Sequence, residues 1–274
     1  MRVCEGRLKD RVERGDVLIA GCVADSRSAS VVEIYHDTGF DFLLIDREHT
    51  CLTDETITNH IMVARCLGFP SMVRVVEDNY CELNRTLDHG ADGVFVPRVR
   101  TAEQVENIVS TVKYRPEGIR GLVGGGVPIS KYKGWDSLTE QIDTVNRNTV
   151  VGIQIETAEA LANLDEILSV KGVHIAVVGN DDLSIGMGIP GQTKTPEYIG
   201  QVERIIAACR KHGVLPGIAC GDPDTAVSWI EKGMKCIWYS SDVNLFYQAA
   251  SQGVQAIREH LPGPARCSGG GSGR

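Results

Sequence analysis

The stretch VVGIQIETAEALANLDEILSVKGVHIAVVG (residues 150–179) contains two continuous apolar runs, 150–156 and 173–179, on either side of a helical pattern. In the middle segment, apolar residues recur every three or four positions, which is typical of a helix with one buried face. In the flanking runs, apolar residues do not alternate with polar ones. This pattern is typical of strands in a parallel sheet whose two faces are both covered. The stretch therefore predicts a strand–helix–strand unit with parallel strands.

The same alternation continues along most of the chain. Further apolar runs occupy residues 17–24, 40–46, 70–75, 92–97, 214–219 and 235–240, and helical patterns occupy 101–113, 195–213 and 222–233. Eight strands with helices between them, in 274 residues, predict an α/β protein of the (β/α)8 TIM-barrel type. An open doubly wound sheet is the alternative. The segment GCVADSRSAS (21–30) lacks the GxGxxG that a dinucleotide-binding sheet carries after its first strand.

The domain organisation follows from composition. Residues 1–262 are predicted to form a single barrel domain, and the Gly/Ser-rich residues 263–274 a flexible tail. Residues 114–135 form a long irregular segment, and such segments in compact domains are usually functional.

Charge and composition narrow the functional class. Lys and Arg total 28 against 36 Asp and Glu, a net charge of −8 without a basic run, which argues against nucleic-acid binding. No apolar run is long enough to cross a bilayer, and the N-terminus is too charged for a secretory signal. Nine cysteines without a CxxC pair indicate reduced thiols in a cytoplasmic protein and argue against zinc.

Polar residues follow several predicted strands, where a TIM barrel places its active site. They are Asp46, Glu48, His49, Arg74, Glu156, Asp181, Asp182 and Ser184. Glu156 and Asp182 suit a hard divalent cation, which takes carboxylate oxygens together with water and substrate; the alternative is that each caps a helix. Gln154 shares the inward face of its strand with Glu156, and it either fills the interior or contacts a ligand.

The lysines discriminate between two kinds of aldol chemistry. An aldolase that forms an imine needs a lysine inside the barrel. No lysine stands at the C-terminal end of a predicted strand, and Lys235 begins the last strand instead. The pattern favours metal-assisted enolate chemistry.

Six motifs together resemble one known family: FDFLLIDREHT (40–50), VRV (73–75), LDHGADGVFVPRVRTAEQVE (87–106), RPEGIRG (115–121), VGIQIETAEALANLDEIL (151–168) and VVGNDDLSIGMG (177–188). This is the HpcH/HpaI aldolase family of metal-dependent class II pyruvate aldolases, which includes 4-hydroxy-2-oxoheptanedioate and 2-keto-3-deoxy-glucarate aldolases. The resemblance covers residues 5 to 260. It implies a barrel of the phosphoenolpyruvate/pyruvate-binding type and a homohexamer in which the C-terminal helix packs on a neighbouring subunit.

The resemblance also implies residue roles. Glu156 and Asp182 would hold Mg²⁺ or Mn²⁺, with Co²⁺ as a further option. Arg74 would steady the pyruvate enolate, and His49 would transfer a proton with Asp46 as its orienting carboxylate. Contacts with the substrate are expected from Asp181, Gln154, Ser184, Glu48 and Arg47, with the pyruvate carboxylate against the N–H groups of Asp181 and Asp182.

The implied reaction is the reversible cleavage of a 4-hydroxy-2-oxo acid into pyruvate and an aldehyde. The alternatives are an oxaloacetate decarboxylase or macrophomate-synthase-like enzyme using the same enolate, and a non-catalytic barrel that binds a keto acid. The chain departs from the family pattern at Arg47, at Asn180 and Asp181, and in the loop after RPEGIRG. These departures bear on the substrate more than on the fold.

Overall fold

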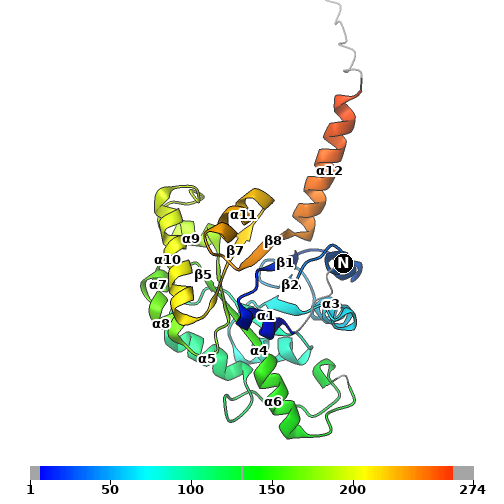
Figure 1. Ribbon diagram of the computed structural model, residues 1–274. Helices are drawn as coiled ribbons and strands as arrows, with labels where there is room; N and C mark the ends of the chain where they lie inside the picture. Colours follow the sequence, from blue (N-terminus) through cyan, green and yellow to red (C-terminus); the bar gives the residue numbers. More distant parts are fainter. Residues whose placement is uncertain (1–6, 131, 262–274) are drawn as a thin grey trace, which may run out of the picture.

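A computed structural model describes residues 7–130 and 132–261. They form a closed barrel of parallel strands in the order β1 to β8 (Figure 1). The strands are β1 (Leu18–Val23), β2 (Phe42–Asp46), β3 (Ser71–Arg74), β4 (Gly93–Val96), β5 (Val150–Ile155), β6 (Ile175–Val178), β7 (Leu215–Cys220) and β8 (Cys236–Ser241). The eight predicted strands and the TIM-barrel fold are thereby confirmed.

Helices precede, connect and follow the strands. They are α1 (Leu8–Arg14), α2 (Ser30–Asp37), α3 (Asp54–Leu67), α4 (Tyr80–Asp88), α5 (Ala102–Val112), α6 (Leu138–Asn148), α7 (Ala158–Ala162), α8 (Leu164–Ser169), α9 (Asn180–Gly186), α10 (Pro196–His212), α11 (Pro223–Glu231) and α12 (Asp242–Glu259). The predicted boundaries of α10 are confirmed, because the Thr195 hydroxyl accepts the Tyr198 N–H and Gly213 adopts a left-handed φ of 71°.

One helix prediction needs correction. The pattern after β5 predicts one continuous helix, but the structure contains α7 and α8, with Asn163 at the junction. The side-chain amide of Asn163 donates to the carbonyl oxygen of Arg100 at 2.8 Å. Asparagine competes for backbone partners in this way and so interrupts helices.

The core has an inner and an outer layer, because strand residues alternate between the barrel interior and the helices. Residues that fill the interior include Leu18, Phe42, Met72 and Ile175. Leu8 and Val12 of α1 belong to the same cluster, so α1 closes the N-terminal end of the barrel. That leaves the C-terminal end of the strands as the open face.

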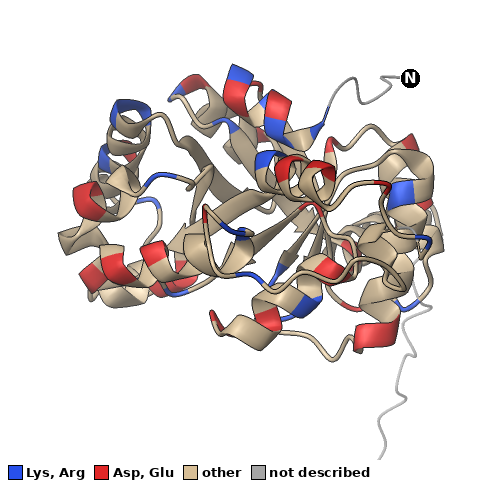
Figure 2. Cartoon of the chain, turned by 90° about the horizontal axis from the view of Figure 1, so that it is seen from below, with Lys and Arg blue, Asp and Glu red and all other residues tan. Residues whose placement is uncertain are grey.

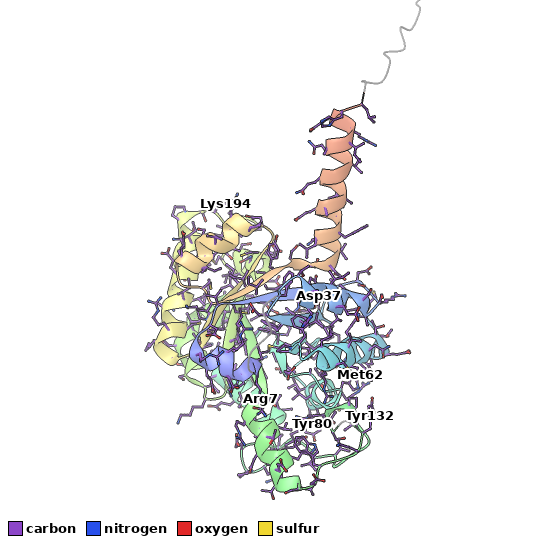
Figure 3. All side chains as sticks on the ribbon, turned by 45° about the vertical axis from the view of Figure 1, so that its right-hand side comes forward. Arg7, Asp37, Met62, Tyr80, Tyr132 and Lys194 are labelled. Atoms are coloured by element: carbon purple, nitrogen blue, oxygen red, sulfur yellow. The ribbon has the colours of Figure 1, made fainter. Side chains whose placement is uncertain are left out.

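The irregular segment between α5 and α6 is also present as predicted, with one short 3-10 turn at Pro128–Ser130. It packs against α3: the hydroxyl of Tyr132 lies 3.7 Å from the sulfur of Met62, and Arg65 donates to the carbonyl oxygen of Pro128. Tyr132 and Met62 are labelled together in Figure 3.

Helix α12 extends away from the barrel (Figures 1 and 3). None of its residues is buried. Apolar side chains are nevertheless numerous on it, including Phe246 at 77% exposure and Tyr247 at 71%. The predicted tail, residues 263–274, lies outside the described residues.

Charged side chains of both signs are interspersed on the outer helices (Figure 2). Within residues 7–130 and 132–261, no helix is long and apolar enough to span a membrane. Over the same residues, seven cysteines are unpaired, four of them buried and three exposed.

Candidate active site

The ends of β2 and β3 bring Asp46 and Arg74 together at the open face of the barrel. The two residues are Cα partners in the parallel register. Arg74 Nε and Nη2 donate to the two carboxylate oxygens of Asp46 at 2.8 and 2.7 Å. Its guanidinium also lies 4.7 Å from the centre of the Trp238 ring, so the arginine is fixed from two directions.

Asp46 was predicted to orient His49, and the structure corrects that pairing. Both oxygens of Asp46 bind Arg74, and one also accepts the Glu48 N–H at 2.9 Å. His49 lies in the turn beyond the strand, with its side chain 60% exposed and its Nε2 3.6 Å from Glu48 Oε2. Since register neighbours on adjacent strands meet directly, Arg74 rather than His49 becomes the partner of Asp46.

Glu48 is a buried carboxylate shared by two arginines. Only 3% of its side chain is exposed. Arg74 Nη1 lies 3.2 Å from Glu48 Oε2, and Arg98 Nε donates to Oε1 at 3.0 Å. The structure therefore brings Glu48 into the centre of the predicted residues.

Glu156 stands directly after β5 and is almost fully buried at 3% exposure. Its Oε2 accepts the side-chain amide of Gln154 at 2.9 Å, and its Oε1 accepts the backbone N–H of Arg98 at 2.7 Å. Burial raises the pKa of Glu156 to about 7, with further contributions from the negative charges of Glu48 and Asp182. The carboxylate does not cap α7, whose N-cap hydroxyl belongs to Thr157.

Gln154 contacts the site and does not merely fill the interior. Besides its bond to Glu156, its carbonyl oxygen accepts from Arg74 Nη1 at 3.5 Å. It thus links the arginine to the carboxylate.

Gly179, at the end of β6, leaves space for Glu156. A Cβ atom built on Gly179 would lie 2.1 Å from Glu156 Oε2. Any larger residue here would displace the carboxylate.

The first turn of α9 carries Asp181 and Asp182, both exposed. Asp182 follows β6, the neighbour of β5 in the barrel, and its negative charge raises the pKa of both Glu156 and Arg98. Asn180 anchors this turn, since its side chain donates to the Ala219 carbonyl oxygen at 2.7 Å and accepts from the Tyr198 hydroxyl at 2.8 Å.

Two predicted substrate contacts lie apart from this cluster. Ser184 is fully buried, and its hydroxyl donates to the Asp181 carbonyl oxygen and accepts the Gly191 N–H, so it ties α9 to the following loop. Arg47 forms ion pairs with Asp54 at 2.7 Å and Glu82 at 3.3 Å. Strand alternation explains Arg47, because the residue after the inward-facing Asp46 points away from the interior.

Arg98 belongs to the site although the sequence reasoning did not select it. It follows β4 in the motif VFVPRVR (94–100). Its position directly after the predicted strand 92–97 is the sequence signal that indicates it.

The donor set fits a divalent cation. Glu156 and Asp182 supply the hard oxygen ligands that Mg²⁺ and Mn²⁺ prefer. A cation held by these carboxylates would also offset the repulsion that contributes to the raised pKa of Glu156. The described part of the chain contains no ready-made cluster of three or more His, Cys, Asp or Glu ligands, so water and substrate would complete the coordination, as is usual for Mg²⁺.

The barrel and its rim of arginines, buried carboxylates and a histidine define a TIM-barrel enzyme. The chain matches the model of the HpcH/HpaI aldolase/citrate lyase family over residues 20–249. It is 34% identical to the 2-dehydro-3,6-dideoxy-6-sulfogluconate aldolase of Pseudomonas putida, covering 85% of this chain and 90% of that protein. It is 30% identical to the 2-keto-3-deoxy-L-rhamnonate aldolase of Escherichia coli K12, covering 93% and 94%.

A solved structure agrees with the sequence comparisons. The HpcH/HpaI aldolase from Desulfitobacterium hafniense DCB-2 superposes with a TM-score of 0.88 at 30% identity, covering 94% of this chain and 98% of that one. The chain belongs to the HpcH/HpaI aldolase/citrate lyase family. It is an enzyme of the carbon–carbon lyase class.

Proposed function

We propose that this enzyme is a divalent-cation-dependent aldolase that reversibly cleaves a 4-hydroxy-2-oxo acid into pyruvate and an aldehyde. The observation that carries the proposal is the buried Glu156 carboxylate, which Gln154 and the Arg98 N–H hold in place and on which the charge of Asp182 acts. Burying a carboxylate without a cationic partner is costly. A divalent cation would supply positive charge at Glu156 in addition to that of Arg74.

The substrate proposal takes its chemistry from the relatives. Both are named as aldolases of 2-keto-3-deoxy sugar acids, one of a rhamnonate and one of a sulfogluconate. Such acids carry a 2-oxo group and a 4-hydroxyl group. We infer that the substrate of this chain is a 2-keto-3-deoxy sugar acid.

Glu156 and Asp182 would hold Mg²⁺ or Mn²⁺. The cation, when bound, acts as a Lewis acid toward the keto group of the substrate. Arg74 holds a permanent positive charge next to this position, and Asp46, Glu48 and Trp238 keep it from moving. A fixed charge of this kind stabilises negative charge that develops on the substrate oxygen.

His49 is the proposed proton carrier. Histidine suits this role near neutral pH. Its exposed ring stands at the mouth of the barrel, and Glu48 is the carboxylate nearest to it in this geometry.

Pyruvate release from synthetic 2-keto-3-deoxy sugar acids, measured with a coupled lactate dehydrogenase assay, tests the proposal. Release is expected with Mg²⁺ or Mn²⁺ and should stop after chelation, while Glu156→Gln and Asp182→Asn should each lose at least a hundredfold in kcat/KM. Release that persists after thorough chelation would rule out the cation. Wild-type rates in both variants would rule out the ligand assignment.

A further inference from the structure

Arg98 is held in an unusual position at the edge of the proposed site. Its backbone N–H donates to Glu156 Oε1 at 2.7 Å, and it adopts a φ of 55°. Residues with a side chain rarely adopt this left-handed conformation, and it concentrates at functional sites, where the surroundings enforce it. The backbone thus fixes the origin of the Arg98 side chain next to a proposed cation ligand.

The guanidinium of Arg98 is oriented by Glu48. Nε donates to Glu48 Oε1 at 3.0 Å, and Nη2 donates to the same oxygen. The Glu48 side chain is 3% exposed and that of Arg98 is 54% exposed. One edge of the guanidinium is therefore anchored on a buried carboxylate, and the remainder faces the open mouth of the barrel.

Two other arginines near this rim, Arg74 and Arg47, are already paired with carboxylates. Arg74 is buried in its bidentate pair with Asp46, and Arg47 is held by Asp54 and Glu82. Glu48 also divides its single charge between Arg74 and Arg98. Arg98 thus keeps an incompletely neutralised, solvent-facing edge, and its Nη1 has no hydrogen-bond acceptor within the described chain.

We propose that Arg98 is a specificity-determining residue that binds an anionic group at the end of the substrate remote from the 2-oxo acid. The inference rests on the proposed function, and it means that the aldehyde half carries a carboxylate, sulfonate or phosphate. Guanidinium recognises these oxygen anions through paired, charge-assisted hydrogen bonds. Because Glu48 holds the guanidinium in place beforehand, little side-chain freedom is lost when the anion binds.

The aldol addition of pyruvate to matched aldehydes tests the inference. Succinic semialdehyde and butanal have the same carbon chain and differ in a terminal carboxylate; glyceraldehyde 3-phosphate and glyceraldehyde differ in a phosphate. The measured quantity is the ratio of kcat/KM for the charged over the neutral member of each pair. The wild type should prefer the charged member of at least one pair, which identifies the anion.

Arg98→Met should lower the preferred ratio at least tenfold, and Arg98→Lys should restore part of it. Arg100→Met is the matched control, since Arg100 is an exposed arginine two residues along the same loop, and its ratio should equal that of the wild type. A wild type that prefers the neutral member of both pairs, or an unchanged ratio in Arg98→Met, would overturn the inference.

Exchange of the C3 protons of pyruvate with solvent tests the proposed aldolase function separately from the role of Arg98, because no aldehyde takes part in this exchange. A wild-type enzyme without exchange would refute the proposed function itself. Exchange combined with an unchanged ratio in Arg98→Met would refute the role of Arg98 alone.

Discussion

At the scale of single residues, the position and the pKa of the Glu156 carboxylate depend on its burial and on the space beside Gly179. Burial raises the pKa of Glu156 to about 7, so the carboxylate exchanges protons in the range where the enzyme would bind its cation. Lower pH favours the protonated form, which is a poor ligand. The absence of a side chain at Gly179 lets the carboxylate occupy its position.

Gly179→Ala should therefore lower the affinity for Mn²⁺ at least tenfold, because the new Cβ would take the place of Glu156 Oε2. Mn²⁺ titration followed by electron paramagnetic resonance measures this. Gly200→Ala is the control, since a Cβ at Gly200 on α10 meets nothing within 4 Å. Equal affinities in the two variants would contradict the proposed role of Glu156.

At this scale, the sequence predicts which residues reach the rim better than it predicts how they pair. The positions of Asp46 at the end of β2 and of Gln154 and Glu156 at the end of β5 agree with the predicted strand ends. The partner of Asp46 depends on the β2–β3 register, which a single sequence does not contain. The sequence likewise does not show that Arg47 pairs with carboxylates at the starts of α3 and α4.

At the scale of elements, the sequence predicts all eight strands, because short continuous apolar runs bounded by turn residues are typical of buried strands. The sequence does not predict the break between α7 and α8, because the break depends on a tertiary hydrogen bond from the Asn163 side chain to the Arg100 carbonyl oxygen. Helix α12 is joined to its own barrel mainly at its first residue, where Asp242 accepts the backbone N–H groups of Ala24 and Ser26, and the sequence does not show that the rest of the helix stays exposed.

The loop into β6 contains a pH-sensitive contact. His174 Nδ1 accepts the Val151 N–H at 2.9 Å, which requires the neutral ring. Burial, assisted by the positive charges of Lys9 and Lys113, lowers the pKa of His174 to about 3. Between that value and the ordinary histidine pKa, the unfolded chain binds a proton that the folded chain does not, so stability falls as pH decreases below 6.5.

The free energy of unfolding should fall by at most roughly 1.4 kcal/mol per pH unit below 6.5 through this histidine. Urea unfolding at pH 7 and pH 5 measures it, and His174→Gln should show a smaller difference between the two than the wild type. His260→Gln, at the exposed residue that caps the C-terminus of α12, should behave like the wild type. The same pH dependence in His174→Gln would disprove the assignment.

At the scale of the whole molecule, α12 exposes apolar side chains that a single chain does not bury. We propose, in line with the family resemblance, that its apolar side chains pack on a second copy of the chain. Solvent exposure of residues as apolar as Phe246, Tyr247 and Ile257 is unfavourable and marks an interface.

Light scattering after size exclusion should give a mass well above the 29.7 kDa of a single chain. Phe246→Asp and Ile257→Asp should each shift the protein toward the monomer, whereas Gln252→Asp, on the opposite face of α12, should not. A wild type that elutes as a monomer would exclude this role of α12.

The central claim, cation-dependent activation of pyruvate, is tested most directly by proton NMR of pyruvate in D₂O. With enzyme and Mg²⁺, we predict that the C3 methyl signal disappears through exchange. Chelation of the cation should abolish this loss of the C3 methyl signal, and the Glu156→Gln substitution should have the same effect. Exchange that continues at the wild-type rate in the chelated enzyme, or no exchange in the Mg²⁺-loaded wild type, would contradict the account.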